Sequence, residues 1–189
     1  DYFFATISPF TYLAGTRLTE IAERHNLDVV YKPLDIMSLF ARTGGLPPKD
    51  RHPNRQAYRL QDLERSAKKV GLPLNVKPMF WPTNPAPASY ALIAAQNAKN
   101  KGTATGNLDV LMHELGRRCW ANEKNIAEND VIAEALVEAG FDAALADSGL
   151  LEGAETYAAN LEEAISRGVF GAPFYVTEDD QRFWGQDKL

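Results

Sequence analysis

The sequence predicts an α/β fold in which a long all-helical segment is inserted into a small sheet domain. Strand-like segments occur near both ends of the chain, and none interrupts residues 35–167, where apolar residues recur at helical spacing. A helical bundle alone would neither begin nor end with strands. The sheet domain is therefore predicted from residues 1–34 together with 168–189, and the helical insertion domain from residues 35–167.

The N-terminal segment predicts a strand, a helix and a second strand. Residues 2–7 are aromatic and β-branched, as in a buried strand. Ser8 is a favoured helix cap and Pro9 suits the first helical position, so a helix is predicted over residues 9–26. Residues 28–34 predict the second strand. Two strands joined by a helical crossover run parallel.

The rest of the chain predicts helices followed by a hairpin. Helices are predicted over residues 58–70, 88–99, 108–121, 130–139 (with Asp130 as the cap) and 155–167, separated by loops at residues 43–48 and 72–88. Near the end, residues 174–176 and 181–184 predict an antiparallel pair of strands, and residues 185–187 the start of another helix.

Composition argues against several classes of function. The 189 residues carry 20 basic and 25 acidic side chains, and the net charge of −5 argues against a nucleic-acid partner. No apolar run approaches the roughly 18 residues of a membrane span, and no signal peptide is visible. The single cysteine, Cys119, allows no internal disulfide, and the three histidines have no recognisable metal-site spacing. We therefore expect a cytoplasmic protein without a metal or a membrane partner.

The junction at Ser8 is the first candidate site. It lies where the first strand passes into a helix, and the carboxyl end of a parallel strand is where α/β proteins bind ligands. A helix N-terminus stabilises a thiolate, but this position carries a hydroxyl. Such a hydroxyl can donate a hydrogen bond to a thiolate that a small molecule brings. The alternative is that Ser8 only caps the helix.

The second candidate is the segment from Gly168 to Phe174. Pro173 enters a strand, where proline needs an edge, a strand start or a cis bond. A cis bond here would expose the backbone of Ala172 to an extended peptide. An ordinary strand start explains the proline equally well.

Together these motifs resemble a known family. They are Ser-Pro-Phe-Thr-Tyr-Leu at residues 8–13, Tyr58 with residues 62–65, Gly-Val-Phe-Gly-Ala-Pro at 168–173, and Phe-Trp-Gly-Gln-Asp-Lys-Leu at 183–189. The chain resembles the 2-hydroxychromene-2-carboxylate isomerase family, which is close to kappa-class glutathione transferases and to DsbA-type proteins. The resemblance implies a thioredoxin-like fold with a large all-helical insertion domain.

The resemblance also implies a glutathione site. Ser8 is expected to be catalytic and to hold the glutathione sulfur as a thiolate. The backbone of Ala172, before Pro173, is expected to pair with the cysteinyl part, and Gln186 and Asp187 to bind the γ-glutamyl end. Arg55, which keeps the charge of a lysine frequent in the family, is expected to join the cofactor-binding residues. Asp187 has an alternative role, because an acidic residue in a first helical turn favours the helix dipole.

The substrate would be a small aromatic molecule with a carboxylate. Lys49 and Asn54 are candidates for its polar contacts, with Arg55 as a further clamp, and they could replace an asparagine of the family that is Gly45 here. Thr11 stands where thioredoxin-like oxidoreductases have their second cysteine. Phe10, Phe80 and Trp81 are candidates for an apolar slot, and plain core packing is the alternative for them.

The reaction implied is cis–trans isomerisation in naphthalene-type aromatic catabolism, through reversible addition of a glutathione thiolate. Two alternatives stay open: a kappa-like glutathione transferase that conjugates electrophiles, and a thioredoxin-like module that binds glutathione or a peptide without turnover. A disulfide oxidoreductase is chemically implausible, because Ser8 and Thr11 replace both cysteines. Related proteins are often dimers, so a homodimer is expected.

Overall fold

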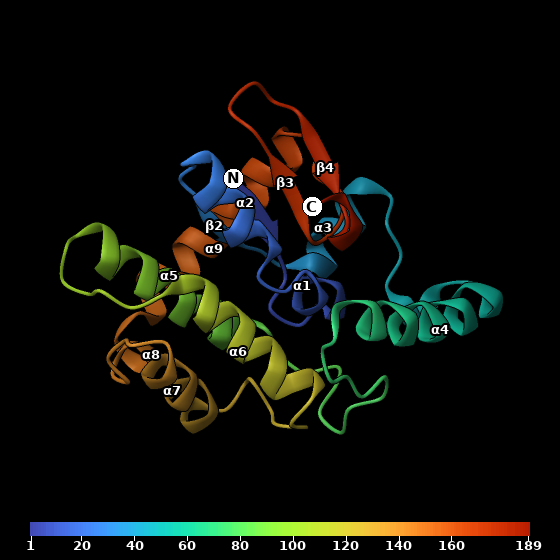
Figure 1. Ribbon diagram of the computed structural model, residues 1–189, viewed down its shortest axis with the longest axis horizontal. Coiled ribbons are helices and arrows are strands. Elements are labelled where there is room, and N and C mark those ends of the chain that lie inside the picture. The colour runs from blue at the N-terminus through green and yellow to red at the C-terminus, as the bar shows by residue number, and fades with distance from the viewer.

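The computed structural model describes residues 1–189 and contains a four-stranded mixed sheet (Figure 1). The strands are β1 (Tyr2–Phe4), β2 (Tyr31–Pro33), β3 (Phe174–Val176) and β4 (Arg182–Trp184), in the order β2-β1-β3-β4. β1 is parallel to β2 and antiparallel to β3, and β3 is antiparallel to β4. The parallel pairing and the C-terminal hairpin are both as predicted.

Helices make up most of the chain. They are α1 (Pro9–Leu13), α2 (Arg17–His25), α3 (Ile36–Thr43), α4 (Pro53–Val70), α5 (Ala86–Asn100), α6 (Leu108–Trp120), α7 (Asn129–Glu138), α8 (Leu145–Ser148) and α9 (Leu150–Ser166), with short 3-10 turns η1 (Pro48–Asp50) and η2 (Gln186–Lys188). None of these helices is long and apolar enough to cross a membrane.

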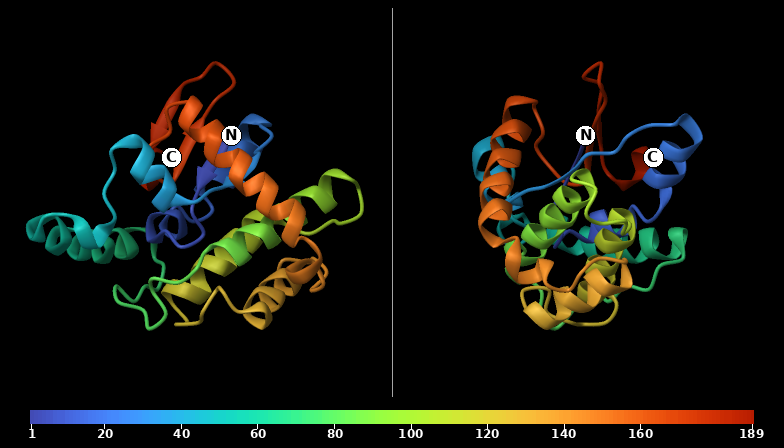
Figure 2. Two further views of the ribbon diagram at one scale, coloured as in Figure 1. Left: turned by 180° about the vertical axis from the view of Figure 1, so that it is seen from behind. Right: turned by 90° about the vertical axis from the view of Figure 1, so that its left-hand side faces the viewer.

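Both faces of the inner strands β1 and β3 are buried, which explains why these strands are nearly continuously apolar. Along β1, Phe3 points into a smaller core formed with α3 and α9, whereas Tyr2 and Phe4 point into a larger core. Figure 2 shows α3 and α9 on one side of the sheet and α2 on the other. The outer strand β4 is exposed along its whole length.

The larger core joins the sheet to the inserted helices. Its 26 buried residues include Tyr31 and Tyr175 from the strands and Leu92, Leu115 and Trp120 from α5 and α6. On the other face, Asn160 of α9 donates from Nδ2 to the carbonyl of Pro33 at 2.9 Å. The division of the chain into domains at residues 34 and 168 stays a prediction.

The single helix predicted over residues 9–26 is wrong. The helix breaks after Leu13 and resumes at Arg17, because Gly15 adopts a left-handed φ of +61°. The short α1 that results carries Ser8 at its start, and α2 leaves in a new direction. The strands are also shorter than predicted, since β1 ends at Phe4 and β2 begins only at Tyr31.

Other helix boundaries differ from the prediction. The helix α3 was not predicted, although Asp35 caps it by accepting from Met37 N and Ser38 N. The helix predicted from Tyr58 begins at Pro53, where His52 Nδ1 accepts from Asn54 N.

The later helices also differ from the prediction. Asp130 is not the cap of α7, which begins one residue earlier and has no side-chain cap. The short α8 was also missed, and α9 begins at Leu150 rather than at residue 155.

At Gly153, α9 packs closely against α5. A Cβ placed there would lie 2.7 Å from Tyr90 Cβ and 2.8 Å from Tyr90 Cα, so backbone atoms would have to move. We expect Gly153→Ala to lower the free energy of unfolding by about 1–3 kcal/mol, because overpacking outweighs the better helix propensity of alanine. Urea denaturation measures this, with Glu155→Ala at an exposed position of α9 as the control. An unchanged midpoint for Gly153→Ala would contradict the close packing.

Candidate functional site

Ser8 caps α1 at the carboxyl end of β1. Its Oγ accepts a hydrogen bond from Thr11 N at 3.3 Å, so the predicted capping role is present. The hydroxyl hydrogen of Ser8 has no acceptor in the protein, and the backbone N–H of Phe10 has no partner. The half-buried Ser8 therefore keeps one free donor beside an unpaired N–H at the start of a helix.

The pairing of β1 with β3 brings Ala172 and Pro173 to the same edge of the sheet. Phe3 pairs with Phe174 in an antiparallel ladder, so the residues after β1 meet the residues before β3. The Ala172–Pro173 peptide bond is cis. Neither the N–H nor the C=O of Ala172 makes a hydrogen bond. A half-buried peptide group with both polar atoms free can pair with an extended peptide ligand.

The C-terminal turn lies beside the same helix. Gly185 N donates to the carbonyl of Pro173 at 3.0 Å, and η2 then packs against α1. The side chain of Gln186 is half-buried and unpartnered. The exposed carboxylate of Asp187 accepts from Lys188 Nζ at 2.8 Å, and this bond lowers the pKa of Asp187. The residues predicted for the γ-glutamyl end thus lie next to α1.

Lys49 lies in η1, whereas Asn54 and Arg55 lie in the first turn of α4, which packs against α1. All three are exposed, and their side chains form no hydrogen bond or ion pair. A side chain at Gly45 would overlap the ring of Phe40, so a residue with a Cβ at this position would require Phe40 to move.

The predicted aromatic residues divide between core and surface. Phe10 and Trp81 are half-buried and pack against the larger core, which supports the packing alternative for part of each ring. Trp81 contacts Trp120 with ring centroids 5.6 Å apart. Phe80 is 40% exposed in the loop before α5, so its ring remains available to a ligand.

Thr11 is a predicted site residue that the structure buries. The residue is 3% exposed, and its Oγ1 has no partner. The only thiol is also inaccessible, because Cys119 is buried in α6 and burial raises its pKa to about 12. A reactive thiolate at Ser8 therefore has to come from a bound molecule.

The sequence did not single out Arg51 and Arg59, which flank Arg55 at one-turn intervals. Arg51 Nε donates to the carbonyl of Leu46 at 2.8 Å, and the guanidinium of Arg59 lies 5.3 Å from the centroid of the Trp81 ring. The spacing of four residues was visible in the sequence. What the sequence could not reveal is that no carboxylate pairs with any of these arginines.

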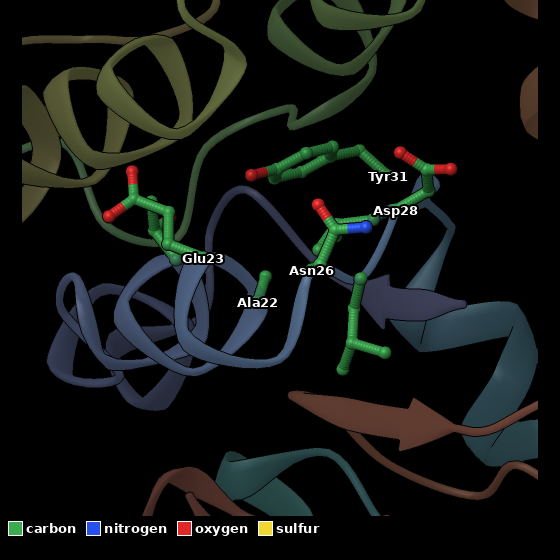
Figure 3. Close-up of a pocket in the computed structure, with 8 residues that line it drawn as sticks. Ala22, Glu23, Asn26, Asp28 and Tyr31 are labelled. Carbon is green, nitrogen blue, oxygen red and sulfur yellow. The ribbon is translucent and has the colours of Figure 1, made fainter.

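A separate surface hollow of about 300 Å³ lies between the end of α2 and the start of β2 (Figure 3). Figure 3 shows Tyr31 and Asn26 in its wall together with the acidic side chains of Glu23 and Asp28. None of the predicted site residues lines it. The structure also contains no group of three or more side chains suited to a metal ion.

Fold and site together define a thioredoxin-like protein with a helical insertion and a serine in place of the first thiol. The sequence matches the family model of the DSBA-like thioredoxin domain over residues 1–189. It is 32% identical over 203 residues to the 2-hydroxychromene-2-carboxylate isomerase of Sphingobium xenophagum, covering 100% of this chain and 93% of that protein. It is 27% identical over 206 residues to glutathione S-transferase kappa 2 of Caenorhabditis elegans, covering 100% and 87%.

The structure is also similar to a solved 2-hydroxychromene-2-carboxylate isomerase. The TM-score is 0.75 at 24% identity, over 99% of this chain and 88% of that one. The chain therefore belongs to the DSBA-like thioredoxin family and, within it, to the 2-hydroxychromene-2-carboxylate isomerases. The predicted resemblance and the predicted fold class are confirmed.

His113 on α6 supports a prediction on pH. Its ring lies 5.2 Å from that of Tyr12, its Nδ1 is buried without a partner, and burial lowers its pKa below 6.5. As the pH falls below about 6.5, the unfolded chain takes up this proton before the folded chain does, so the free energy of unfolding decreases. We expect His113→Gln to lose less stability than the wild type between pH 7 and 5 in urea titrations. The same change at the exposed His25 is the control, and identical slopes for wild type and His113→Gln would contradict the assignment.

Proposed function

We propose that the protein is a glutathione-dependent isomerase of the 2-hydroxychromene-2-carboxylate type, acting on a small aromatic substrate with a conjugated double bond. The observation that carries the proposal is the free peptide group of Ala172 at the same edge of the sheet as the free hydroxyl of Ser8. These groups complement the cysteinyl unit of a peptide thiol, and the chain supplies no accessible thiol of its own.

The residues near α1 fit glutathione along its length. The N–H and C=O of Ala172, ahead of Pro173, suit the backbone of its cysteinyl residue. The unpartnered amide of Gln186 and the carboxylate of Asp187 suit the γ-glutamyl end, with its ammonium and carboxylate groups. Arg55 on the neighbouring α4 carries an unpaired charge for the glycyl carboxylate. The kappa-class glutathione transferase among the relatives gives independent support for this cofactor.

Glutathione bound here supplies a thiolate that adds reversibly to the conjugated bond of the substrate, so that the bond rotates and the cofactor is returned unchanged. Ser8 donates a hydrogen bond that favours the ionised sulfur, and the unpaired Phe10 N–H adds to the local positive potential. Moving a thiol pKa from roughly 8.5 to 7 takes about 2 kcal/mol. One hydrogen bond to a charged group, at about 1.5–3 kcal/mol, is sufficient.

The remaining roles concern the aromatic substrate. Phe10, Phe80 and Trp81 lie on α1 and in the loop before α5, where they offer apolar surface for a ring. Lys49 and Asn54 carry free polar groups at the entrance to α4. Thr11 supports the position of Ser8 through its backbone N–H. Its buried hydroxyl, which has no partner in the protein, is included among the substrate-binding groups of the proposal. A cytoplasmic location, where glutathione is kept largely reduced, and a homodimer belong to the proposal as well.

A kappa-like glutathione transferase is the second candidate, favoured by the kappa-class relative. It would use the same cofactor site and release a conjugate instead of returning the thiol. The two reactions therefore differ in what happens to glutathione, and a module that binds without turnover differs from both.

The Ser8 hydroxyl is expected to set the ionisation of the bound thiol. In Ser8→Ala, the thiol pKa of bound glutathione should rise by about one unit or more, because a charge-assisted hydrogen bond is lost. Thiolate absorbance near 240 nm as a function of pH measures this in the complex. Ser166→Ala, at an exposed serine of α9, is the control. An unchanged titration in Ser8→Ala would show that the serine is only a helix cap.

Product analysis tests the reaction itself. With an aromatic substrate of the 2-hydroxychromene-2-carboxylate type, we expect many turnovers at a constant concentration of free thiol, because the cofactor is regenerated. Thiol titration together with chromatography of the products measures both quantities. Loss of one thiol per turnover would support the transferase, and binding of glutathione without any turnover would support the binding module.

A further inference from the structure

Arg59 is a partly buried cation without a counterion. It lies on the second turn of α4, is half-buried, and forms no hydrogen bond or ion pair. Asp62, which is near Arg59 along the helix, does not approach it to ion-pair distance. Burial, reinforced by the charge of Arg51, lowers the pKa of Arg59 to about 10. An uncompensated charge of this kind is costly in a folded protein unless a ligand provides its counterion.

Trp81 adds a second unpaired donor at the same place. The Arg59 guanidinium lies 5.3 Å from the centroid of the Trp81 ring, and the indole Nε1 is buried without an acceptor. A guanidinium and an indole N–H are both donors only, so neither can satisfy the other. A carboxylate has the complementary acceptors and the opposite charge.

The surroundings suit a carboxylate that is attached to an aromatic ring. Tyr58, Met79 and Phe80 are exposed apolar side chains within two residues of Arg59 or of Trp81 in the sequence. The α4 helix packs against α1, the helix that Ser8 caps. Arg55, one turn before Arg59, also lacks a counterion, so the helix offers separate cations for two different carboxylates.

We infer that Arg59 and the Trp81 indole N–H form the subsite that binds the carboxylate of the aromatic substrate, while Arg55 serves the glycyl carboxylate of glutathione. The inference rests on the proposed function and makes it more specific, because it assigns the substrate clamp to a residue that the sequence analysis did not select. Glutathione itself is the other possible source of a carboxylate at this place, so the test has to separate the two.

Direct binding gives the first test and needs no glutathione. The probe is trans-2-hydroxycinnamate, with its methyl ester as the uncharged control, and the readout is the Trp81 indole N–H resonance, assigned with Trp81→Phe. We expect a saturable shift with the acid and none with the ester. Arg59→Gln should weaken binding of the acid at least about tenfold. Arg65→Gln, an exposed position on the same helix, should leave it unchanged.

Kinetics give the second test. Arg59→Gln should raise the KM for the aromatic carboxylate at least about tenfold while the Kd for glutathione, from calorimetry, stays unchanged. Arg59→Lys keeps the charge without the planar fork, so it should show an intermediate KM and provides a folded variant if Arg59→Gln is unstable. A changed Kd for glutathione with an unchanged response to the probe would assign the site to the glycyl carboxylate and overturn the inference. No response of the indole resonance to the acid would overturn it as well.

The two proposals fail in different ways. The indole shift is recorded without glutathione, so it is independent of any thiolate at Ser8. If Ser8→Ala leaves the bound thiol unaffected but the Arg59 effects appear, the anion subsite stands and the thiolate role is lost. The opposite pattern removes the subsite and leaves the cofactor site in place.

Discussion

The antiparallel pairing of β1 with β3 is the constraint on which the candidate site depends. It joins Tyr2 to Tyr175 and Phe3 to Phe174, residues from opposite ends of the chain. The same junction is reinforced at Asp1, whose backbone carbonyl accepts from Val176 N at 2.9 Å and whose carboxylate pairs with Arg167. Without this pairing Ser8 and Ala172 would not share an edge of the sheet, and neither residue alone is more than a helix cap or a strand start.

Local signals were sufficient for the elements that flank the site. Ser8 followed by proline indicated the cap of α1, and the turn near Asp180 indicated the hairpin of β3 and β4. The motif before Pro173 was compatible with a cis peptide bond and with an ordinary strand start, and the sequence did not decide between them. The resemblance to known isomerases then joined these separate signals into one site, which no periodicity or spacing would have done.

Other features depend on packing and could not be read from the sequence. The break after Leu13 requires Gly15 to adopt a left-handed backbone conformation. A single glycine in an apolar periodic segment does not predict such a break. The caps of α3 and α4, Asp35 and His52, lie in segments for which the sequence analysis predicted no helix. The unpaired state of Arg59 is a property of its neighbours, because acidic residues nearby in sequence do not reach it. Pairing and burial become visible only when the chain is folded.

The burial of Cys119 affects how well the protein resists oxidation. A thiolate that reacts readily also oxidises readily, and its sulfinic and sulfonic acids are largely irreversible. Here the protein's single thiol is shielded within α6, and the serine at the start of α1 cannot be oxidised in this way. Under the proposed function, oxidation therefore affects the sulfur of bound glutathione, which exchanges with the free pool, and leaves the polypeptide unchanged at this site.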